Sequence, residues 1–290
     1  MSVRGQWRLA AMGMATILGL ARRGWFIPYR YAAGLPRAGA SPAYAPIETL
    51  FQNVSDELLS PLAALDGLAD RLRAIGETGA ANQAPGGPRW RQGWFPPLDA
   101  AIAYAMVAQH KPRLIVEVGS GHSTRFLARA VADGGLATRI VAIDPAPRAS
   151  LAGLAPAVEL LPCTVHQAGA AAFAALGAGD MLFIDSSHIL MPGSDVDFLF
   201  NRILPTLPAG VLAHIHDVTL PDDYPRAWAW RGYNEQLAVI PLLLSGAWRA
   251  LFASHFVATR HGAVLARSPV AGLPHLPGAF PTSLWLQKAR

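Results

Sequence analysis

The chain has 290 residues, of which 52% are hydrophobic and 15% are charged. This composition supports a large buried core and excludes a chain that is disordered throughout. Six arginines and no acidic residue precede Glu48, so subtracting these six from the net charge of +5 leaves −1 for the rest of the chain. A body so close to neutral argues against a nucleic-acid groove.

Residues 1–33 form an apolar and basic N-terminal arm. The apolar run at 9–21 is about 13 residues long, short of the ~20 needed to span a bilayer. Arg22 and Arg23 stand where a signal peptide would need small residues for cleavage. Three interpretations remain open: packing on the body or on a second subunit of a homo-oligomer, peripheral contact with an anionic membrane surface through residues 1–30, and a targeting peptide. Large apolar side chains accompany the arginines: Trp7, Met14, Leu18 and Trp25.

The single cysteine, Cys163, excludes an intramolecular disulfide and a cysteine-rich zinc site. Such a chain fits a reducing compartment, so we expect a cytoplasmic protein, peripheral to the inner face of the membrane if the arm binds lipid. Cys163 itself is expected to be a small core residue in a strand at 158–165.

Residues 34–89 are expected to form a linker and a helical cap. Glycine and proline gather at 34–46 and again at 82–88, which is typical of loops. Between these stretches, apolar residues recur at helical spacing from about Ile47 to Ile75.

Residues 90–290 are expected to form one α/β domain. A helix is predicted at 100–109, and from Arg113 onward strand and helix patterns alternate, which predicts a doubly wound, mostly parallel, seven-stranded sheet. The predicted strands are 113–118, 139–144, 158–165, 180–185, 210–216, 248–257 and 283–288. The predicted helices are 122–133, 148–153, 168–177, 195–204 and 233–245.

The segment 113–126 has the pattern of a buried strand, a tight glycine turn and a helix start. Gly119 and Gly121 allow positive φ and close approach of the backbone to a ligand. Glu117 is a carboxylate at the end of an apolar strand, where burial is costly without a role. This junction predicts a nucleotide-like ligand, with Ser120, Ser123 or Thr124 capping the helix.

The glycine pattern distinguishes two cofactors. An NAD-type fingerprint would place glycine or alanine at position 124, where this chain has Thr124. The order acid, any residue, Gly, any residue, Gly resembles the S-adenosylmethionine (SAM) site of class I methyltransferases. Asp144, at the end of the second strand, is expected to accept hydrogen bonds from ribose hydroxyls, and Gln167 stands where the family often has an acid near the adenine amino group. The resemblance implies a SAM site that includes Glu117, Gly119, Ser120, Gly121, His122, Ser123, Asp144, Gln167 and Asp185.

Polar side chains also end the fourth and fifth predicted strands. Asp185 and His188 follow the fourth strand, and His216 and Asp217 follow the fifth. In open α/β sheets the ligand lies beyond the carboxyl ends of the strands. We therefore expect these four residues to converge beside the methyl donor as the catalytic group.

The four residues resemble the arrangement in catechol O-methyltransferases, where acids and an amide at these positions hold Mg²⁺. His188 replaces that family's lysine base, and an unperturbed histidine pKa of ~6.5 suits a base near neutral pH. His216 replaces an oxygen ligand, so a metal held by Asp185, His216 and Asp217 could be Mn²⁺, Fe²⁺ or Zn²⁺. The alternative is no metal, with His188 or His216 as a base oriented by an aspartate.

Residues 90–288 as a whole resemble a Methyltransf_24-like bacterial branch of class I methyltransferases that includes cephalosporin- and macrolide-type O-methyltransferases. The segments that carry this likeness are 183–188, 193–195, 214–217 and 223–225. The resemblance implies a Rossmann-like sheet whose last strand is antiparallel, and SAM-dependent O-methylation of a small-molecule or saccharide hydroxyl. The alternatives are an NAD(P)-dependent oxidoreductase on the same sheet and a non-catalytic SAM-binding subunit.

Overall fold

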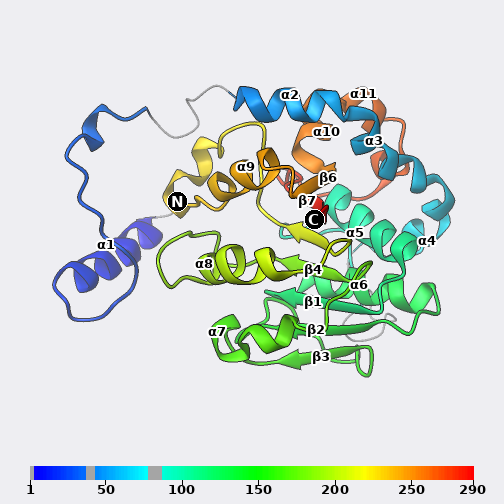
Figure 1. Cartoon of the computed structure of the whole chain (residues 1–290), viewed down its shortest axis with the longest axis horizontal. Helices are drawn as coiled ribbons and strands as arrows, with labels where there is room; N and C mark the ends of the chain where they lie inside the picture. Colours follow the sequence, from blue (N-terminus) through cyan, green and yellow to red (C-terminus); the bar gives the residue numbers. More distant parts are fainter. Residues whose placement is uncertain (1–2, 37–42, 78–86) are drawn as a thin grey trace. The chain divides into compact units, whose positions relative to one another are not determined.

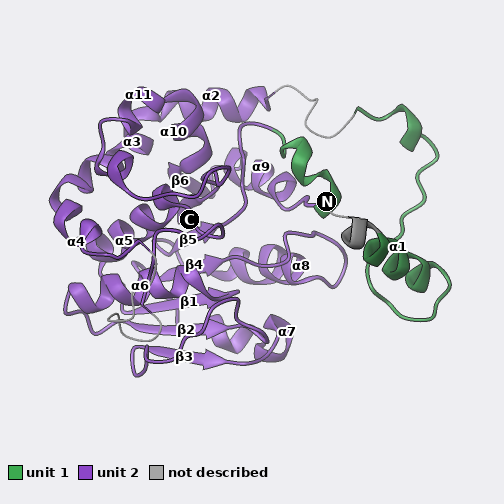
Figure 2. Ribbon diagram, turned by 180° about the vertical axis from the view of Figure 1, so that it is seen from behind, with its two compact units in different colours: residues 1–42, 223–232 green, residues 43–222, 233–290 purple. Residues whose placement is uncertain are grey.

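The computed structural model describes residues 3–36, 43–77 and 87–290 (Figure 1). These residues form two compact units, one of residues 1–42 with 223–232 and one of residues 43–222 with 233–290 (Figure 2). The predicted break at 82–88 lies almost entirely outside the described residues, as does 37–42 of the predicted linker.

The first unit contains the helix α1 (Val3–Ile17) and two short 3-10 helices, η1 (Ala32–Gly34) and η6 (Arg226–Arg231). α1 ends in a glycine cap, because Gly19 has φ +69° and Leu20 donates its N–H to Ala15 O at 2.9 Å. No helix among the described residues is long and apolar enough to cross a membrane.

The second unit is built on a seven-stranded sheet with the order β3-β2-β1-β4-β5-β7-β6. Strands β1 to β5 are parallel to one another, and β7 lies antiparallel between β5 and β6. This confirms the doubly wound sheet with a late antiparallel strand. The strands are β1 (Leu114–Val118), β2 (Arg139–Ile143), β3 (Val158–Leu161), β4 (Met181–Ile184), β5 (Leu212–Ile215), β6 (Trp248–Ala253) and β7 (Leu284–Lys288).

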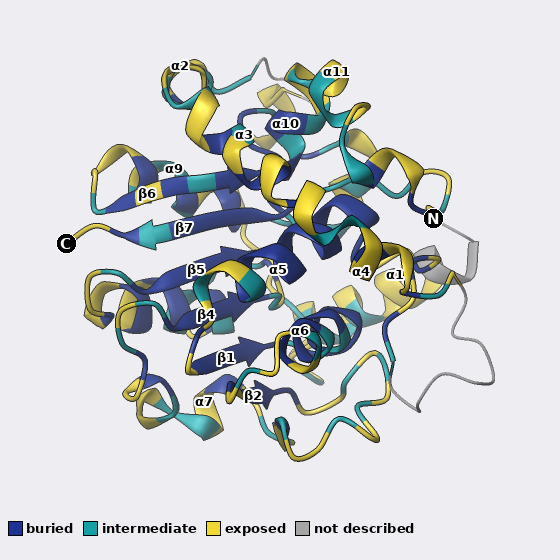
Figure 3. Ribbon diagram, turned by 90° about the vertical axis from the view of Figure 1, so that its right-hand side faces the viewer, coloured by how far each residue is buried: buried dark blue, intermediate teal, exposed yellow. Residues whose placement is uncertain are grey.

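Apolar helices cover both faces of the sheet, so the central strands are buried on both sides (Figure 3). Ile115 of β1 packs in a cluster with α5 (Pro97–His110) and α6 (His122–Asp133). Val116 points to the opposite cluster, with α2 (Ala45–Asn53), α8 (Asp195–Phe198) and α9 (Gln236–Leu244). The alternation of side chains along a strand explains why both residues are apolar.

The helical region predicted from Ile47 is present but interrupted. It consists of α2, α3 (Ser55–Ala64), the 3-10 turn η2 (Asp66–Leu68) and α4 (Ala69–Arg73). These helices belong to the same compact unit as the sheet. α2 begins inside the predicted linker, with Pro46 at a position where helices tolerate proline.

Several predicted boundaries were wrong. The chain at 148–153 forms bends and turns, and the strand predicted to 257 ends at Ala253 because Ser254–Arg260 forms the helix α10. β3 ends at Leu161, so Cys163 lies beyond it and is half-buried.

Two predicted helices are split. The prediction at 168–177 becomes α7 (Val165–Ala168) and η3 (Ala170–Phe173). The prediction at 195–204 becomes α8, the π-turn η4 (Leu199–Ile203) and η5 (Leu204–Thr206). The last two helical elements, α11 (Gly262–Leu265) and η7 (Pro269–Gly272), lie between β6 and β7 in the sequence.

Candidate active site

The glycine turn after β1 joins the two halves of the candidate site. Gly119 has φ +79°, and a Cβ built on it would lie 1.9 Å from the backbone oxygen of Asp185. Asp185, directly after β4, donates its backbone N–H to Val118 O at 2.8 Å. Only glycine permits this approach, so the turn and the end of β4 pack backbone to backbone.

Glu117 is fully buried beside this turn. Its Oε1 accepts a hydrogen bond from the Ser123 hydroxyl at 2.6 Å, whereas Oε2 has no partner among the described residues. Burial raises the pKa of Glu117 to about 8, so the carboxyl is mostly protonated at pH 7. A buried polar atom without a partner is costly, so a ligand group that reached Oε2 would gain from a hydrogen bond with it.

Asp144, at the end of β2, holds the turn in shape. Its Oδ2 accepts hydrogen bonds from the Ser120 N–H at 2.7 Å and from the Ser120 hydroxyl at 3.1 Å, and its Oδ1 accepts one from Ala146 N–H at 2.7 Å. A carboxylate has about four lone-pair sites, so one site on Oδ1 is left for a ligand hydroxyl.

The start of α6 explains why no third glycine is needed. The Gly121 N–H donates to Thr124 Oγ1 at 2.9 Å, so Thr124 caps the helix from the position that glycine or alanine would occupy in an NAD site. Burial lowers the pKa of the neighbouring His122 to about 4, which makes its ring neutral.

Gln167 has a local partner. Its Oε1 accepts a hydrogen bond from the Thr164 N–H at 2.9 Å, and together they cap α7. The adenine contact proposed for Gln167 stays a prediction, and the structure gives it a capping function in addition.

The fourth and fifth strands bring the predicted catalytic residues together around His188. Its Nε2 lies 3.3 Å from Asp185 Oδ1 and 3.5 Å from Asp217 Oδ2. Its Nδ1 lies 2.7 Å from Oε2 of Glu235, the residue before α9. One imidazole therefore faces three carboxyl groups that come from three separate segments.

The backbone at this cluster is strained. His188 has φ 61° and Asp217 has φ 54°, and Lys111 is the one other described non-glycine residue with a positive φ. Lys111 follows a helix end, where such a conformation is common. Strain of this kind gathers at functional sites, and here it holds the His188 ring and the Asp217 carboxylate against each other.

Charge and exposure divide the cluster into an inner and an outer part. The His188 side chain is 2% exposed, whereas those of Asp185 and Asp217 are 30% and 14% exposed. Burial would lower the pKa of His188, but hydrogen bonds to Asp185 and Glu235 and the nearby negative charges outweigh it and raise the pKa well above its usual value. His188 is thus an imidazolium behind two carboxylates that reach the surface.

Nearby positively charged side chains change the pKa of Asp185. Burial alone would raise the pKa of Asp185, but His216, His188 and Arg148 lower it below its usual value. Burial raises the pKa of Glu235 on the inner side. Asp185 is therefore the ionised group that this cluster presents outward across the neutral pH range.

His216 lies beside the cluster and is held separately. Its Nε2 lies 3.1 Å from Trp94 O and 3.8 Å from Asp217 Oδ1. The buried Asp99 of α5 accepts hydrogen bonds from the backbone N–H groups of Thr282 and Ser283, the two residues before β7. Thr282 Oγ1 in turn donates to Asp217 Oδ1 at 3.2 Å, so α5 and β7 help to fix Asp217.

The residues predicted to bind a metal do not form a ligand set. Among the residues that the structure describes, no three His, Cys, Asp or Glu side chains could hold an ion. His188 lies between Asp185 and Asp217, and His216 Nε2 must carry a proton to bond to Trp94 O, which can only accept. These side chains therefore do not fit the predicted divalent metal.

Two functional features escaped the sequence prediction. Glu235 lies 47 residues after His188, and no local pattern marks it. The Arg148 guanidinium stacks on the exposed Trp94 ring, 4.4 Å from its centroid, and Arg148 N–H donates to Ser120 O at 3.2 Å. This pair forms a rim between the glycine turn and His216.

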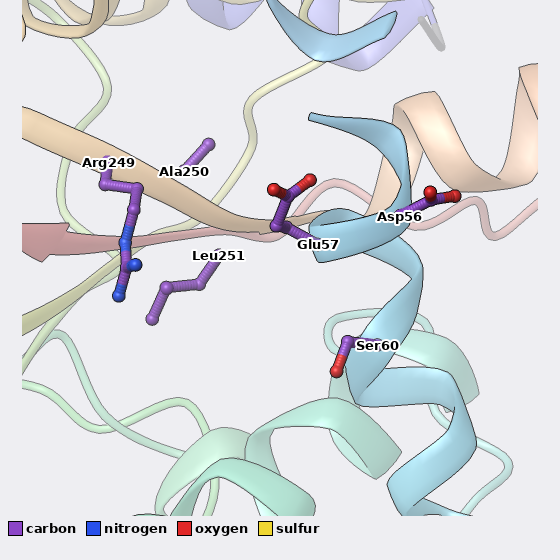
Figure 4. Close-up of a pocket in the computed structure, with 6 residues that line it drawn as sticks. All are labelled: Asp56, Glu57, Ser60, Arg249, Ala250 and Leu251. Carbon is purple, nitrogen blue, oxygen red and sulfur yellow. The ribbon is translucent and has the colours of Figure 1, made fainter. Parts of the chain in front are cut away.

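A separate pocket of about 440 Å³ lies between α3 and the edge strand β6 (Figure 4). Asp56, Glu57 and Ser60 line it from α3, and Arg249 and Leu251 line it from β6. It is at the edge of the sheet and shares no residue with the strand-end cluster. The cluster, not this pocket, carries the candidate chemistry.

Comparison with protein families gives one match. Residues 116–218 match the Methyltransf_24 model, described as a methyltransferase domain. The matched segment runs from β1 past β5 and contains the glycine turn, Asp144, Asp185, His188 and His216 to Val218. No curated protein matches the sequence.

Comparison with solved structures gives distant similarities. TomG, an O-methyltransferase from Streptomyces achromogenes involved in tomaymycin synthesis and solved with SAM, is 14% identical with a TM-score of 0.41, covering 86% of this chain and 100% of that one. An O-methyltransferase from Bacillus cereus, solved with S-adenosylhomocysteine (SAH), is 17% identical with a TM-score of 0.38, covering 84% and 100%. The SAH-bound Podospora anserina methyltransferase PaMTH1 is 14% identical with a TM-score of 0.42, covering 92% and 100%. At such scores the fold assignment rests on the strand order of this chain.

Proposed function

We propose that this chain, whose residues 116–218 match a methyltransferase domain, is a class I SAM-dependent methyltransferase that transfers the methyl group of SAM to a hydroxyl group of a small molecule or saccharide. The observation that carries the proposal is the pair of partly exposed carboxyl groups, Asp185 and Asp217, that lie 3.3 Å and 3.5 Å from Nε2 of the buried His188 ring at the strand ends beside the glycine turn.

The turn offers groups that suit the parts of SAM. The unpartnered Oε2 of Glu117 suits a cationic amino group, and the remaining lone pair of Asp144 suits a ribose hydroxyl. When bound, SAM would supply an activated methyl group on a sulfonium; its methyl C–S bond would break as the C–O bond forms, and the neutral thioether SAH would leave. We include in this site Gly119, Ser120, Gly121, His122, Ser123, Gln167 and Asp185.

The protein's part in the transfer is to align the acceptor and to receive its proton. An acceptor hydroxyl can donate a hydrogen bond to the exposed oxygens of Asp185 or Asp217, which directs an oxygen lone pair toward the methyl group. The hydroxyl proton passes to the carboxylate as the new C–O bond forms. His188 was expected to be the base, but its burial and its raised pKa favour a positioning role behind the two carboxylates.

Glu235 is a second positioning residue in this proposal. Its bond to His188 Nδ1 fixes the ring so that Nε2 faces both aspartates. His216, whose Nε2 lies 3.8 Å from Asp217 Oδ1, is also a positioning residue in this proposal.

Methyl transfer from labelled SAM to a panel of phenolic, aliphatic and saccharide hydroxyls tests the proposal. We expect Asp185→Asn and Asp217→Asn each to lower kcat/KM by about 100-fold or more, as for the loss of a group that takes up a proton. Asp197→Asn, in the first turn of α8 and outside the cluster around His188, is the matched control and should retain activity. Full turnover in both aspartate variants, or transfer to amines or thiols alone, would contradict the proposal.

We also expect a small-molecule acceptor rather than nucleic acid, given the near-neutral body. Homo-oligomer formation stays a prediction, which sedimentation of the purified protein can check. Membrane contact concerns the N-terminal arm, a different part of the chain.

A further inference from the structure

The N-terminal arm and the two residues after it hold most of the exposed large apolar side chains in the described part of the chain. Twelve of the seventeen lie between residues 7 and 35, with Trp7 at 73% and Leu20 at 77% exposed. Contiguous apolar exposure on this scale marks an interaction surface. The twelve are Trp7, Leu9, Met14, Ile17, Leu18, Leu20, Trp25, Phe26, Ile27, Tyr29, Tyr31 and Leu35.

Basic side chains are interleaved with these apolar ones, and the arm has no acidic residue. The Arg22 guanidinium lies 5.7 Å from the Trp25 ring centroid, and that of Arg30 lies 5.7 Å from the Tyr31 ring centroid. Aromatic rings beside arginines are typical of segments at a membrane interface, because the ring enters the headgroup layer while the guanidinium remains among the phosphates.

The local structure gathers the charges at one end of α1. After the glycine cap the chain folds back, and Arg23 N–H donates to Thr16 Oγ1 at 3.0 Å. This contact places Arg22 and Arg23 near the C-terminal carbonyls of the helix, where cations are favoured. Trp7 and Met14, seven residues apart, lie on one face of α1.

We propose that this arm binds the surface of an anionic lipid bilayer, with α1 and residues 25–31 lying in the interface. Charge complementarity selects this partner. A second copy of the chain is a poorer partner, because a two-fold interface of the arm with itself would place arginines opposite arginines. The proposal is independent of methyl transfer.

Sedimentation of the full chain with vesicles tests this proposal. We compare phosphatidylcholine alone with phosphatidylcholine containing roughly a third of phosphatidylglycerol. The wild-type protein should bind the anionic vesicles only, and binding should weaken as salt rises to about 0.5 M. Arg22→Glu with Arg23→Glu should reduce the binding constant at least about tenfold, as should Trp25→Ser with Phe26→Ser.

Matched controls change the same chemistry elsewhere. Arg139→Glu with Arg202→Glu makes the same change in net charge at exposed positions of the other unit, and Leu237→Ser with Leu244→Ser removes exposed apolar side chains there. Both controls should bind vesicles as wild type does, and equal SAH affinity in all variants shows that each is folded. The proposal would be overturned if the wild-type protein did not bind anionic vesicles, or if the arm variants bound them as wild type does. It would also be overturned if the wild-type protein formed a dimer, did not bind vesicles, and lost the dimer in the Trp25→Ser, Phe26→Ser variant.

Discussion

At the scale of single residues, the candidate site is characterised by the shifted pKa values of its carboxyl groups. Two carboxyl groups, Glu117 and Glu235, have raised pKa values because they are buried, while that of Asp185 is lowered by the nearby positive charges. Groups whose environments separate their pKa values mark functional sites. Here Glu117 and Glu235 are carboxyl groups that favour the protonated form, whereas Asp185 is a carboxylate that stays ionised at neutral pH and can accept a hydrogen bond from an acceptor hydroxyl.

The raised pKa of Glu117 predicts that cofactor binding is coupled to the release of a proton. Its pKa of about 8 means that it is mostly protonated at pH 7 when no ligand is present, and a cationic amino group beside it would favour the ionised form. We therefore expect SAH binding at pH 7 to release nearly one proton, and its affinity to rise as pH increases toward 8. Calorimetry in buffers of different ionisation enthalpy measures this release, and Glu117→Gln should abolish it. The same release in Glu117→Gln would assign the proton to another group.

The raised pKa of His188 predicts that the free energy of unfolding changes with pH. The folded protein holds this proton to a pH well above ~6.5, the value at which an unfolded chain loses it. The stabilisation from charged His188 is therefore complete below about pH 6.5 and is lost as pH rises through the folded pKa. Urea unfolding at several pH values should show the free energy of unfolding falling more steeply above pH 6.5 in wild type than in His188→Gln.

A second variant controls for the possibility that His188→Gln does not fold. Glu235→Gln keeps the shape of the side chain and removes one negative charge beside His188, so it should reduce the same slope. Slopes equal to that of wild type in both variants would show that His188 is not charged in the folded protein.

The strand-end residues could be predicted from the sequence for a physical reason. Asp185 and Asp217 directly follow buried apolar strands, and parallel strands bring their carboxyl ends to one edge of the sheet. Glu235 could not be predicted, because its contact with His188 depends on the path of the 218–235 loop. The protonation of His188 depends on that same contact.

At the scale of elements, Gly119 couples β1 to β4. We expect Gly119→Ala to lower the free energy of unfolding by about 3 kcal/mol, because the new Cβ would overlap the Asp185 carbonyl in a backbone conformation that alanine avoids. Gly135→Ala is the control, since Gly135 has φ +58° but no atom near its Cβ position, and should cost about 1 kcal/mol. Denaturant unfolding measures both, and equal losses would show that the close contact is unimportant.

Elements with strong apolar patterns were predicted well, and those with mixed signals were not. α6 begins and ends as predicted, because the glycine turn and the amphipathic pattern agree. The 254–257 stretch was assigned to a strand because Phe256 and Val257 suit a buried strand or a buried helix equally. At 148–153 the nearby Pro145 and Pro147 precede bends instead of a helix.

At the scale of the whole molecule, the chain combines a methyltransferase sheet with an arm of different composition. The arm's exposed apolar and basic residues show in the sequence as a charge asymmetry, but exposure itself could be read only from the structure. The sheet carries the central claim, that this chain binds SAM at the β1 turn.

Calorimetric titration of the full chain with SAH tests that claim most directly. We predict saturable binding with one site per chain. Asp144→Ala should weaken it at least about tenfold, since a lost hydrogen bond to a charged group costs roughly 1.5–3 kcal/mol. The absence of binding by wild-type protein at millimolar SAH would contradict the account.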